Sequence, residues 1–138
     1  MENQNLKFDF VFLGQSILKY QVPLDIFSTI NQIYEQNFHK LAPANGQLVG
    51  KIENEHSLFY HGKDQKMKNH NMLPRNVTDY FMTVFKHYLA FNKIRDYDLH
   101  LNSIWVNEMK QHEYNPAHVH RGMLFTGLSS VMILLKAR

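Results

Sequence analysis

Hydrophobic and polar positions divide the chain into segments with different periods. Residues 8–22 are rich in Phe, Val, Ile and Tyr and are interrupted by Gly14, which predicts one or two strands with a bend. Pro23 then opens a segment whose apolar residues recur every three or four positions, as on one face of a helix. Proline suits a first helical turn because its missing N–H would have no partner there. The predicted apolar face consists of Ile26, Phe27, Ile30, Ile33 and Tyr34.

The middle of the chain is polar and then becomes helical again. Residues 39–74 are punctuated by glycine and proline, which predicts loops around short strands. Asn76 is followed three positions later by Asp79, a spacing that resembles a capping pair at the start of a helix. A second apolar stripe at helical spacing follows, made of Tyr80, Phe81, Val84, Phe85, Tyr88 and Phe91.

The C-terminal third has the pattern of strands. Residues 98–109 alternate between apolar and polar, as one strand with one buried face does. The segment "EYNPAHVHRG" (113–122) follows. Residues 131–135 are all apolar, which fits a strand buried on both faces. The predicted order is therefore helices early and strands late, an α+β fold.

Composition narrows the class of protein. The chain has 138 residues, the size of one domain, and 44% of them are hydrophobic, which is enough for a core. There is no cysteine, so disulfides, thiolate metal sites and a cysteine nucleophile are excluded. No apolar run reaches the roughly 18 residues that predict a membrane span, and the N-terminus does not have the pattern of a signal peptide. A cytoplasmic protein without membrane contact is expected.

The net charge of +3 is small, and the lysines are scattered. The densest basic stretch, residues 63–68, also contains Asp64. A nucleic-acid surface usually has a clustered basic face with aromatic or motif support. Composition therefore does not favour nucleic-acid binding.

His118 and His120 are the candidate metal ligands. In a strand, side chains two positions apart point to the same face, so both imidazoles would stand side by side with Val119 behind them. Imidazole nitrogen suits iron, zinc, copper and nickel. A His-x-His pair is a weak signal in a chain with nine histidines. The simpler interpretation, that one histidine packs in the core and the other is solvated, stays open.

The neighbouring sequence supports a site. Trp105 and Asn107 share a phase on the preceding strand, where the indole is expected in the core and the amide at the site or at a strand end. Asn115 and Pro116 form a turn-initiating pair that would return the chain beside that strand. A cupin motif would have a glutamate some four residues after the second histidine, but Leu124 and Phe125 occupy that region.

Residues 101–136 resemble the 2-oxoglutarate/Fe(II)-dependent oxygenases of tailed phages and marine bacteria. The resemblance includes a Trp-x-Asn strand, an Asn-Pro turn, a His-x-His segment and the strand "LSSVMILLK". A weaker resemblance covers "LVGKIENE" (48–55) and "QVPLDIFSTIN" in the N-terminal half. The matching positions are Trp105, Asn107, Asn115, Pro116, His118, His120, Gly127, Ser129 and Ser130.

This resemblance implies a double-stranded β-helix, or jelly-roll, with N-terminal helices packed on it. The single domain 1–138 would divide into a helical and strand part at 1–97 and the first core strands at 98–138. The implied cofactor is Fe(II), held by His118 and His120, and the implied cosubstrate is 2-oxoglutarate, with Asn107 and Asn115 as candidate cofactor-binding residues. If the gene belongs to a phage, the protein is expected in the host cytoplasm.

The sequence departs from the family pattern at two places. The second ligand is usually an acid, and here it is His120. The family also supplies a distal histidine and an arginine from later strands, whereas only 18 residues follow His120. We therefore expect that C-terminal strands are missing, that a second copy completes the site in a homo-oligomer, or that an earlier histidine does. The earlier histidines considered are His56, His61, His70, His100 and His112.

Three functions remain open from the sequence. The first is a dioxygenase that hydroxylates an unidentified substrate with 2-oxoglutarate as small-molecule cosubstrate. The second is an inactive jelly-roll module that binds a partner or serves a phage structure. The third is another histidine-ligated metal dioxygenase of β-barrel type, which the histidine at position 120 favours.

Overall fold

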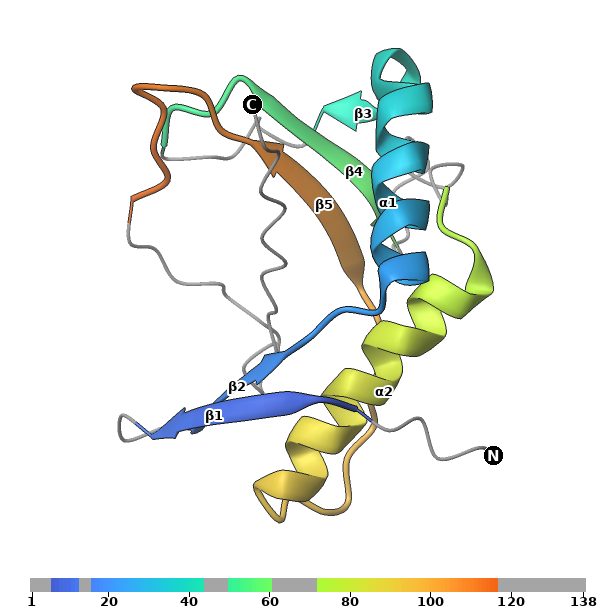
Figure 1. Ribbon diagram of the computed structural model, residues 1–138, viewed down its shortest axis with the longest axis vertical. Helices are drawn as coiled ribbons and strands as arrows, with labels where there is room; N and C mark the ends of the chain where they lie inside the picture. The colour runs from blue at the N-terminus through green and yellow to red at the C-terminus, as the bar shows by residue number, and fades with distance from the viewer. Residues whose placement is uncertain (1–5, 13–15, 44–49, 61–71, 117–138) are drawn as a thin grey trace.

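The computed structural model describes residues 6–12, 16–43, 50–60 and 72–116. These residues form a mixed α+β structure with two α-helices and two small antiparallel sheets (Figure 1). The α+β prediction is confirmed. The described ranges form no closed barrel, and the predicted strand at residues 131–135 lies outside them.

Eight elements follow one another along the described chain. Their order is β1 (Phe8–Phe12), β2 (Ser16–Tyr20), α1 (Leu24–Asn37), the 3₁₀ helix η1 (Phe38–Lys40), β3 (Ala42–Pro43), β4 (Asn54–Tyr60), α2 (Arg75–Phe91) and β5 (Ser103–Glu108). Neither α1 nor α2 has the length and apolar character needed to cross a bilayer.

Helix α1 begins directly after Pro23, as the sequence predicted. Its buried side chains are Ile26, Ile30 and Tyr34, which recur at the predicted spacing of four residues. Ile33 is partly buried and packs against the same cluster. The apolar stripe of the sequence is therefore the face by which α1 contacts the rest of the molecule.

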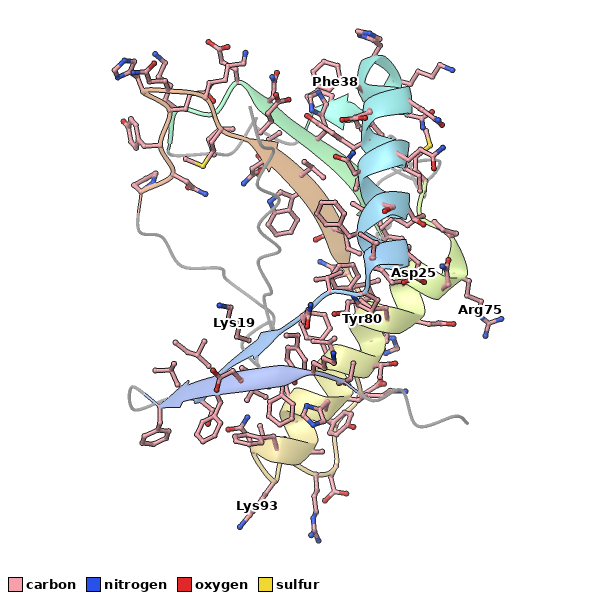
Figure 2. All side chains as sticks on the ribbon, viewed as in Figure 1. Lys19, Asp25, Phe38, Arg75, Tyr80 and Lys93 are labelled. Carbon is pink, nitrogen blue, oxygen red and sulfur yellow. The ribbon has the colours of Figure 1, made fainter. Side chains whose placement is uncertain are left out.

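A proline also precedes helix α2. This residue, Pro74, has an extended backbone conformation. The predicted capping pair is wrong, because the helix already begins at Arg75 and no side chain caps it. Asn76 is thus inside the first turn. The Asp79 carboxylate instead lies 3.5 Å from Arg75 in an exposed ion pair, and Arg75 extends away from the core (Figure 2).

The three-stranded sheet has β4 at its centre, with β3 and β5 on either side. The pairing of β4 with β5 is antiparallel and shifts register between Ser57 and Phe59, so Leu58 is the extra residue of a bulge. The predicted strand at 98–109 is shorter than expected, since β5 starts only at Ser103. The Leu58 carbonyl accepts a hydrogen bond of 3.0 Å from the Met72 amide, which ties the segment before α2 to β4.

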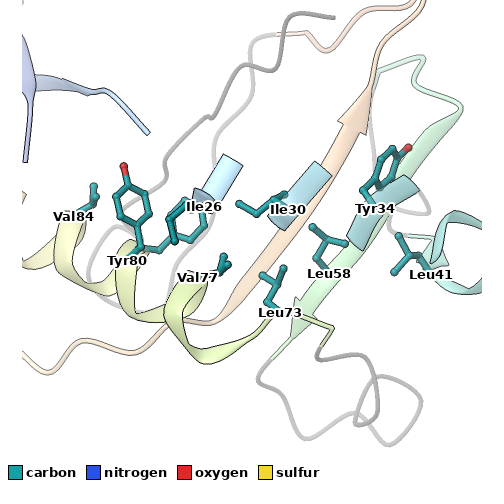
Figure 3. Packing of buried hydrophobic residues seen from close by; sticks show 10 residues of the cluster. Ile26, Ile30, Tyr34, Leu41, Leu58, Leu73, Val77, Tyr80 and Val84 are labelled. Atoms are coloured by element: carbon teal, nitrogen blue, oxygen red, sulfur yellow. The ribbon is translucent and has the colours of Figure 1, made fainter. Parts of the chain in front are cut away.

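The hydrophobic core lies between the two helices and one face of this sheet (Figure 3). Its largest fully buried side chains are one from each element, Ile30 of α1, Leu58 of β4 and Val77 of α2. Ile104 and Val106 of β5 are partly buried against the same cluster. The core therefore covers only the sheet face that carries Leu58 and Val106.

The β1–β2 hairpin lies across the C-terminal half of α2 (Figure 1). This arrangement confirms two strands at 8–22. The Tyr20 hydroxyl and His87 Nδ1 share a hydrogen bond of 2.7 Å, and the Phe8 ring centroid lies 4.7 Å from that of His87. The Tyr88 hydroxyl donates to the Ser16 carbonyl at 3.1 Å. Aromatic and polar contacts together fix the hairpin on the helix.

We expect Leu58→Ala to lower the free energy of unfolding by about 2–5 kcal/mol, because it leaves a cavity at a fully buried position. Leu24→Ala is the matched control, since Leu24 is 77% exposed and its loss should change stability by less than about 0.5 kcal/mol. Urea unfolding of both variants measures the difference. Equal losses in the two would contradict the assigned core.

Candidate functional site

The face of the sheet that points away from the helices carries two residues that the sequence singled out. In the register of β4 and β5, Asn107 lies opposite Glu55 and Trp105 lies opposite Ser57. Because side chains alternate along a strand, these four share one face, and Val106 and His56 share the other. The prediction that Trp105 and Asn107 have the same phase is confirmed. Trp105 is 39% exposed and outside the helix-facing core, so the expectation of core packing is wrong.

Glu55 and Ser57 are the buried members of this face. Each is only 4% exposed, and they are the buried polar residues among the described part of the chain. Neither residue was predicted as a site residue from the sequence. The sequence contains only a weak signal for the position of Glu55. In the strand "NEHSLFY" it alternates with Ser57 and so points away from the core residue Leu58. We call Glu55, Ser57, Trp105 and Asn107 the polar face.

The opposite face carries a second set of ionisable groups, which link α1 to the sheet. The Tyr34 hydroxyl donates a hydrogen bond of 3.1 Å to Glu108 Oε2 at the end of β5. Burial, together with this bond to Glu108, raises the pKa of Tyr34 well above its usual value. The His56 ring lies 4.6 Å from the Phe38 ring, which follows the end of α1 (Figure 2).

His56 is in an unfavourable place for a positive charge. Burial lowers its pKa below the ordinary 6.5, and the negative charge of Glu108 partly offsets this effect. Its Nδ1 atom is buried and has no hydrogen-bond partner within the described ranges. His56 therefore faces the helices as a neutral packed ring, on the side of the sheet opposite to Asn107.

Asn115 lies beside Gly50 at the upstream extension of β4. The Lys51 amide donates to the Tyr114 carbonyl at 2.9 Å, and the Tyr114 amide donates back to the Lys51 carbonyl at 3.0 Å. The chain reverses earlier than predicted, between Lys110 and Glu113, where His112 has a positive φ. The predicted turn at Asn115 and Pro116 is therefore wrong. These two residues lie beside Gly50 instead.

A carboxylate organises the loop that leads to this segment. Glu113 accepts hydrogen bonds from the Lys110 amide at 2.7 Å and from the Glu53 amide at 3.1 Å. The bond from Lys110 is the larger cause that holds the pKa of Glu113 below its usual value. These bonds hold the loop in a defined conformation, and the residues that follow it lie against Gly50.

The structure gives the positions of three of the histidines considered for the site. The others lie outside the described residues. His56 points to the helices, and His100 and His112 are exposed, with His100 3.0 Å from the Asp98 carboxylate. None of these three joins Asn107 on the polar face. The predicted ligands His118 and His120 lie outside the described residues, as do His61 and His70.

The described side chains of metal-ligating type are dispersed over the structure. No three His, Cys, Asp or Glu side chains in these ranges gather closely enough to hold a metal ion. A groove of about 1050 Å³ lies where α1 and α2 begin, lined by residues such as Val22, Asp25 and Tyr80. It contains none of the candidate residues. No family model, curated protein or solved structure matches this chain.

We expect the stability of the protein to fall with pH below about 6.5 in part through His56. A group whose pKa is lowered by folding contributes fully above its unfolded value and loses its contribution as pH falls through the folded value. His56→Phe keeps a ring and removes the ionisation. Urea unfolding between about pH 7 and pH 5 should show a shallower decline for this variant than for the wild type.

Leu24→Ala is the control for this measurement, since it changes an exposed side chain that carries no ionisable group and should leave the pH dependence unchanged. An identical decline for His56→Phe and the wild type would contradict the assigned environment of His56.

We expect Gly50→Ala to disturb the contact with the segment that leads to the histidines. A Cβ at Gly50 would meet the Tyr114 carbonyl and come within 2.8 Å of Pro116 Cδ, so the two segments must separate. The cost of such overpacking is typically about 1–3 kcal/mol. Hydrogen exchange should become faster at the Lys51 and Tyr114 amides. Lys51→Ala, which keeps both backbone bonds, should leave the exchange at Tyr114 unchanged.

Proposed function

We propose that the chain is a 2-oxoglutarate- and Fe(II)-dependent dioxygenase domain of jelly-roll type. The observation that carries the proposal is the arrangement around the polar face. One surface of the sheet is closed by the helical core, and the other presents Asn107 beside a buried carboxylate. A sheet with this division keeps its polar side chains together on one side, where a metal site can be built.

The continuation of the sheet supports the same proposal. The Lys51–Tyr114 bridge extends the sheet upstream of β4, and the chain at Pro116 is two residues from His118. Pro116 is the last described residue before the His-x-His segment, and it lies beside Gly50 just upstream of β4.

The donor set fits a divalent iron. His118 and His120 offer imidazole nitrogen, and the polar face offers carboxylate and amide oxygen, a combination that suits Fe(II) with open positions for other ligands. With O₂ as the oxidant, the bound iron would supply hydroxylation of a C–H bond, in which one oxygen atom goes to the substrate and the other to the succinate formed with CO₂ from 2-oxoglutarate. The residues of this chain would hold the metal, orient the cosubstrate through Asn107 and Asn115, and exclude water from the polar face.

A binding module is the second candidate function, and the β1–β2 hairpin favours it. Phe10, Val11, Phe12 and Ile17 are each more than half exposed, on both faces of the hairpin. Exposed apolar groups that are contiguous often mark an interaction surface. A module of this kind would need the fold but no metal.

The test is an anaerobic titration with Mn(II), used as an oxygen-stable substitute for Fe(II), with and without 2-oxoglutarate. We expect binding that His118→Ala weakens by more than the roughly 10–100-fold that the loss of an outer-shell partner costs. We also expect 2-oxoglutarate to tighten the binding in the wild type. His100→Ala, at an exposed position, should bind as the wild type does.

The other outcomes separate the remaining functions. Binding that needs His118 but is indifferent to 2-oxoglutarate would indicate another histidine-ligated dioxygenase. A folded wild type that binds no metal would contradict both enzyme proposals and leave the binding module.

A further inference from the structure

Within the described part of the chain, the outer edge of β1 has no neighbouring strand, because β1 pairs with β2 alone. The Gln21 amide donates to the Lys7 carbonyl at 3.0 Å. Since hydrogen-bonded pairs alternate along an antiparallel ladder, the odd-numbered residues of β1 direct their backbone groups toward β2. The backbone groups of Phe8, Phe10 and Phe12 therefore point to the outer edge. Such an edge is a template for another strand.

The two edges of the hairpin differ in how far they are occupied. On the β2 edge, the Ser16 carbonyl accepts a hydrogen bond of 3.1 Å from the Tyr88 hydroxyl of α2. On the β1 edge, the Phe10 amide donates to the Asp9 carboxylate at 2.8 Å, a contact made within the strand itself. Asp9 is exposed, so water can replace the amide as its partner at small cost. The β1 edge is thus the one open to a further strand.

The side chains on this edge form an aromatic row that is covered at one end only. The rings of Phe8 and Phe10 lie 6.2 and 5.4 Å from the ring of Phe91 in α2, measured between centroids. Phe12 has the same phase, but its end of β1 extends past α2 (Figure 1). Its side chain is 70% exposed.

The spacing of this row makes β1 complementary to itself. The strand reads FDFVF, with phenylalanine at its first, third and fifth positions. If two copies pair in antiparallel direction about Phe10, each Phe10 lies opposite Phe10 of the other copy, and each Phe12 lies opposite Phe8 of the other copy. Aromatic pairs across neighbouring strands are stabilising. The uncovered end of each row then meets the covered end of the other, so each Phe12 gains an aromatic neighbour.

The backbone groups fit the same register. The outward N–H and C=O groups of Phe8, Phe10 and Phe12 meet the same groups of the other copy, so donors and acceptors are matched without any other segment. A contact in which one surface pairs with itself is closed by a twofold axis and stops at two copies.

We propose that β1 is a self-association edge, through which two copies of the chain form one four-stranded antiparallel sheet with Phe10 on the twofold axis. Asp9 opposes this pairing, because its carboxylate holds the Phe10 amide that the other copy needs. Two five-residue strands form a small interface, so the monomer and the dimer are in an equilibrium that depends on concentration. The inference is independent of the metal chemistry proposed above.

The first test is sedimentation equilibrium of the full chain over a range of concentrations. Phe12→Lys should raise the dimer dissociation constant at least about tenfold, because each copy then places a charge opposite an aromatic ring. Ile17→Lys is the matched control, since Ile17 is also apolar and 53% exposed but lies on β2, on the other face of the hairpin. It should leave the dissociation constant within about twofold. The thermal unfolding midpoints of both variants verify that they fold.

The contact of Asp9 gives a change in the opposite direction. Asp9→Ala frees the Phe10 amide and should tighten the dimer at least about twofold, the effect of one hydrogen bond. Asp9→Asn keeps an oxygen that can accept from this amide and should lie closer to the wild type. A dimer that Asp9→Ala leaves unchanged or weakens would show that Asp9 does not compete for the edge.

The second test measures the register by single cysteines, because the chain contains no cysteine of its own. In the proposed register the two Cα atoms of Phe10→Cys are about 5.5 Å apart, within the roughly 4.4–6.8 Å that a disulfide spans. Those of Phe12→Cys are four strand positions apart, about 13 Å. Mild oxidation should therefore cross-link Phe10→Cys into a covalent dimer and leave Phe12→Cys monomeric. Preferential cross-linking of Phe12→Cys would contradict the register.

The sedimentation results also decide whether the edge is used at all. A wild type that is monomeric at every concentration would overturn the proposal and leave the aromatic row to a different partner, as a binding module requires. A dimer that resists Phe12→Lys, or that Ile17→Lys weakens equally, would use another surface and would overturn it as well. Neither result bears on the Mn(II) titration that tests the proposed function.

Discussion

The packing of Leu58 against Ile30 and Val77 is the contact on which the described structure depends. These three side chains come from β4, α1 and α2, and all are fully buried. Because Leu58 is the extra residue of a bulge, the side chains of both Leu58 and its neighbour Phe59 can reach the core from the same strand.

This packing gives the two faces of the sheet opposite chemistry. The helix-facing side is filled by apolar groups and by the pair of Tyr34 and Glu108. The other side keeps Ser57, Glu55 and Asn107 in one phase. Since a strand alternates its side chains, closing one face with helices leaves the polar residues together on the other.

Three glutamates show how position in the fold sets the role of the same side chain. Glu113 is partly exposed and holds a loop through backbone amides, and its pKa is lowered by those bonds. Glu108 accepts the Tyr34 hydroxyl and opposes the effect of burial on the pKa of His56. Glu55 is buried on the polar face. The different surroundings of these three glutamates therefore follow from burial and direction, which residue type alone does not provide.

Local elements were predictable because their signals are short-range. Apolar residues at three- and four-residue spacing identified both α1 and α2, and alternation identified β5. A proline before the helix identified the start of α1 alone. The same reasoning placed Trp105 and Asn107 in one phase, since the period of a strand needs no knowledge of its partner. The start of α2 was misplaced because an Asn–Asp pair at capping distance also occurs inside a first turn.

What only the tertiary structure decided were the pairings between distant segments. The sequence did not indicate that Asn54–Tyr60 would be the central strand, because its register with β5 depends on a bulge and on contacts far apart in the chain. The burial of Glu55, the direction of His56 toward Phe38 and the contact of Gly50 with Asn115 and Pro116 arise from those pairings. The sequence by itself determined which elements form and the phase of their side chains. Tertiary packing determined which phase faces the core, because that choice is made by the partners of each element.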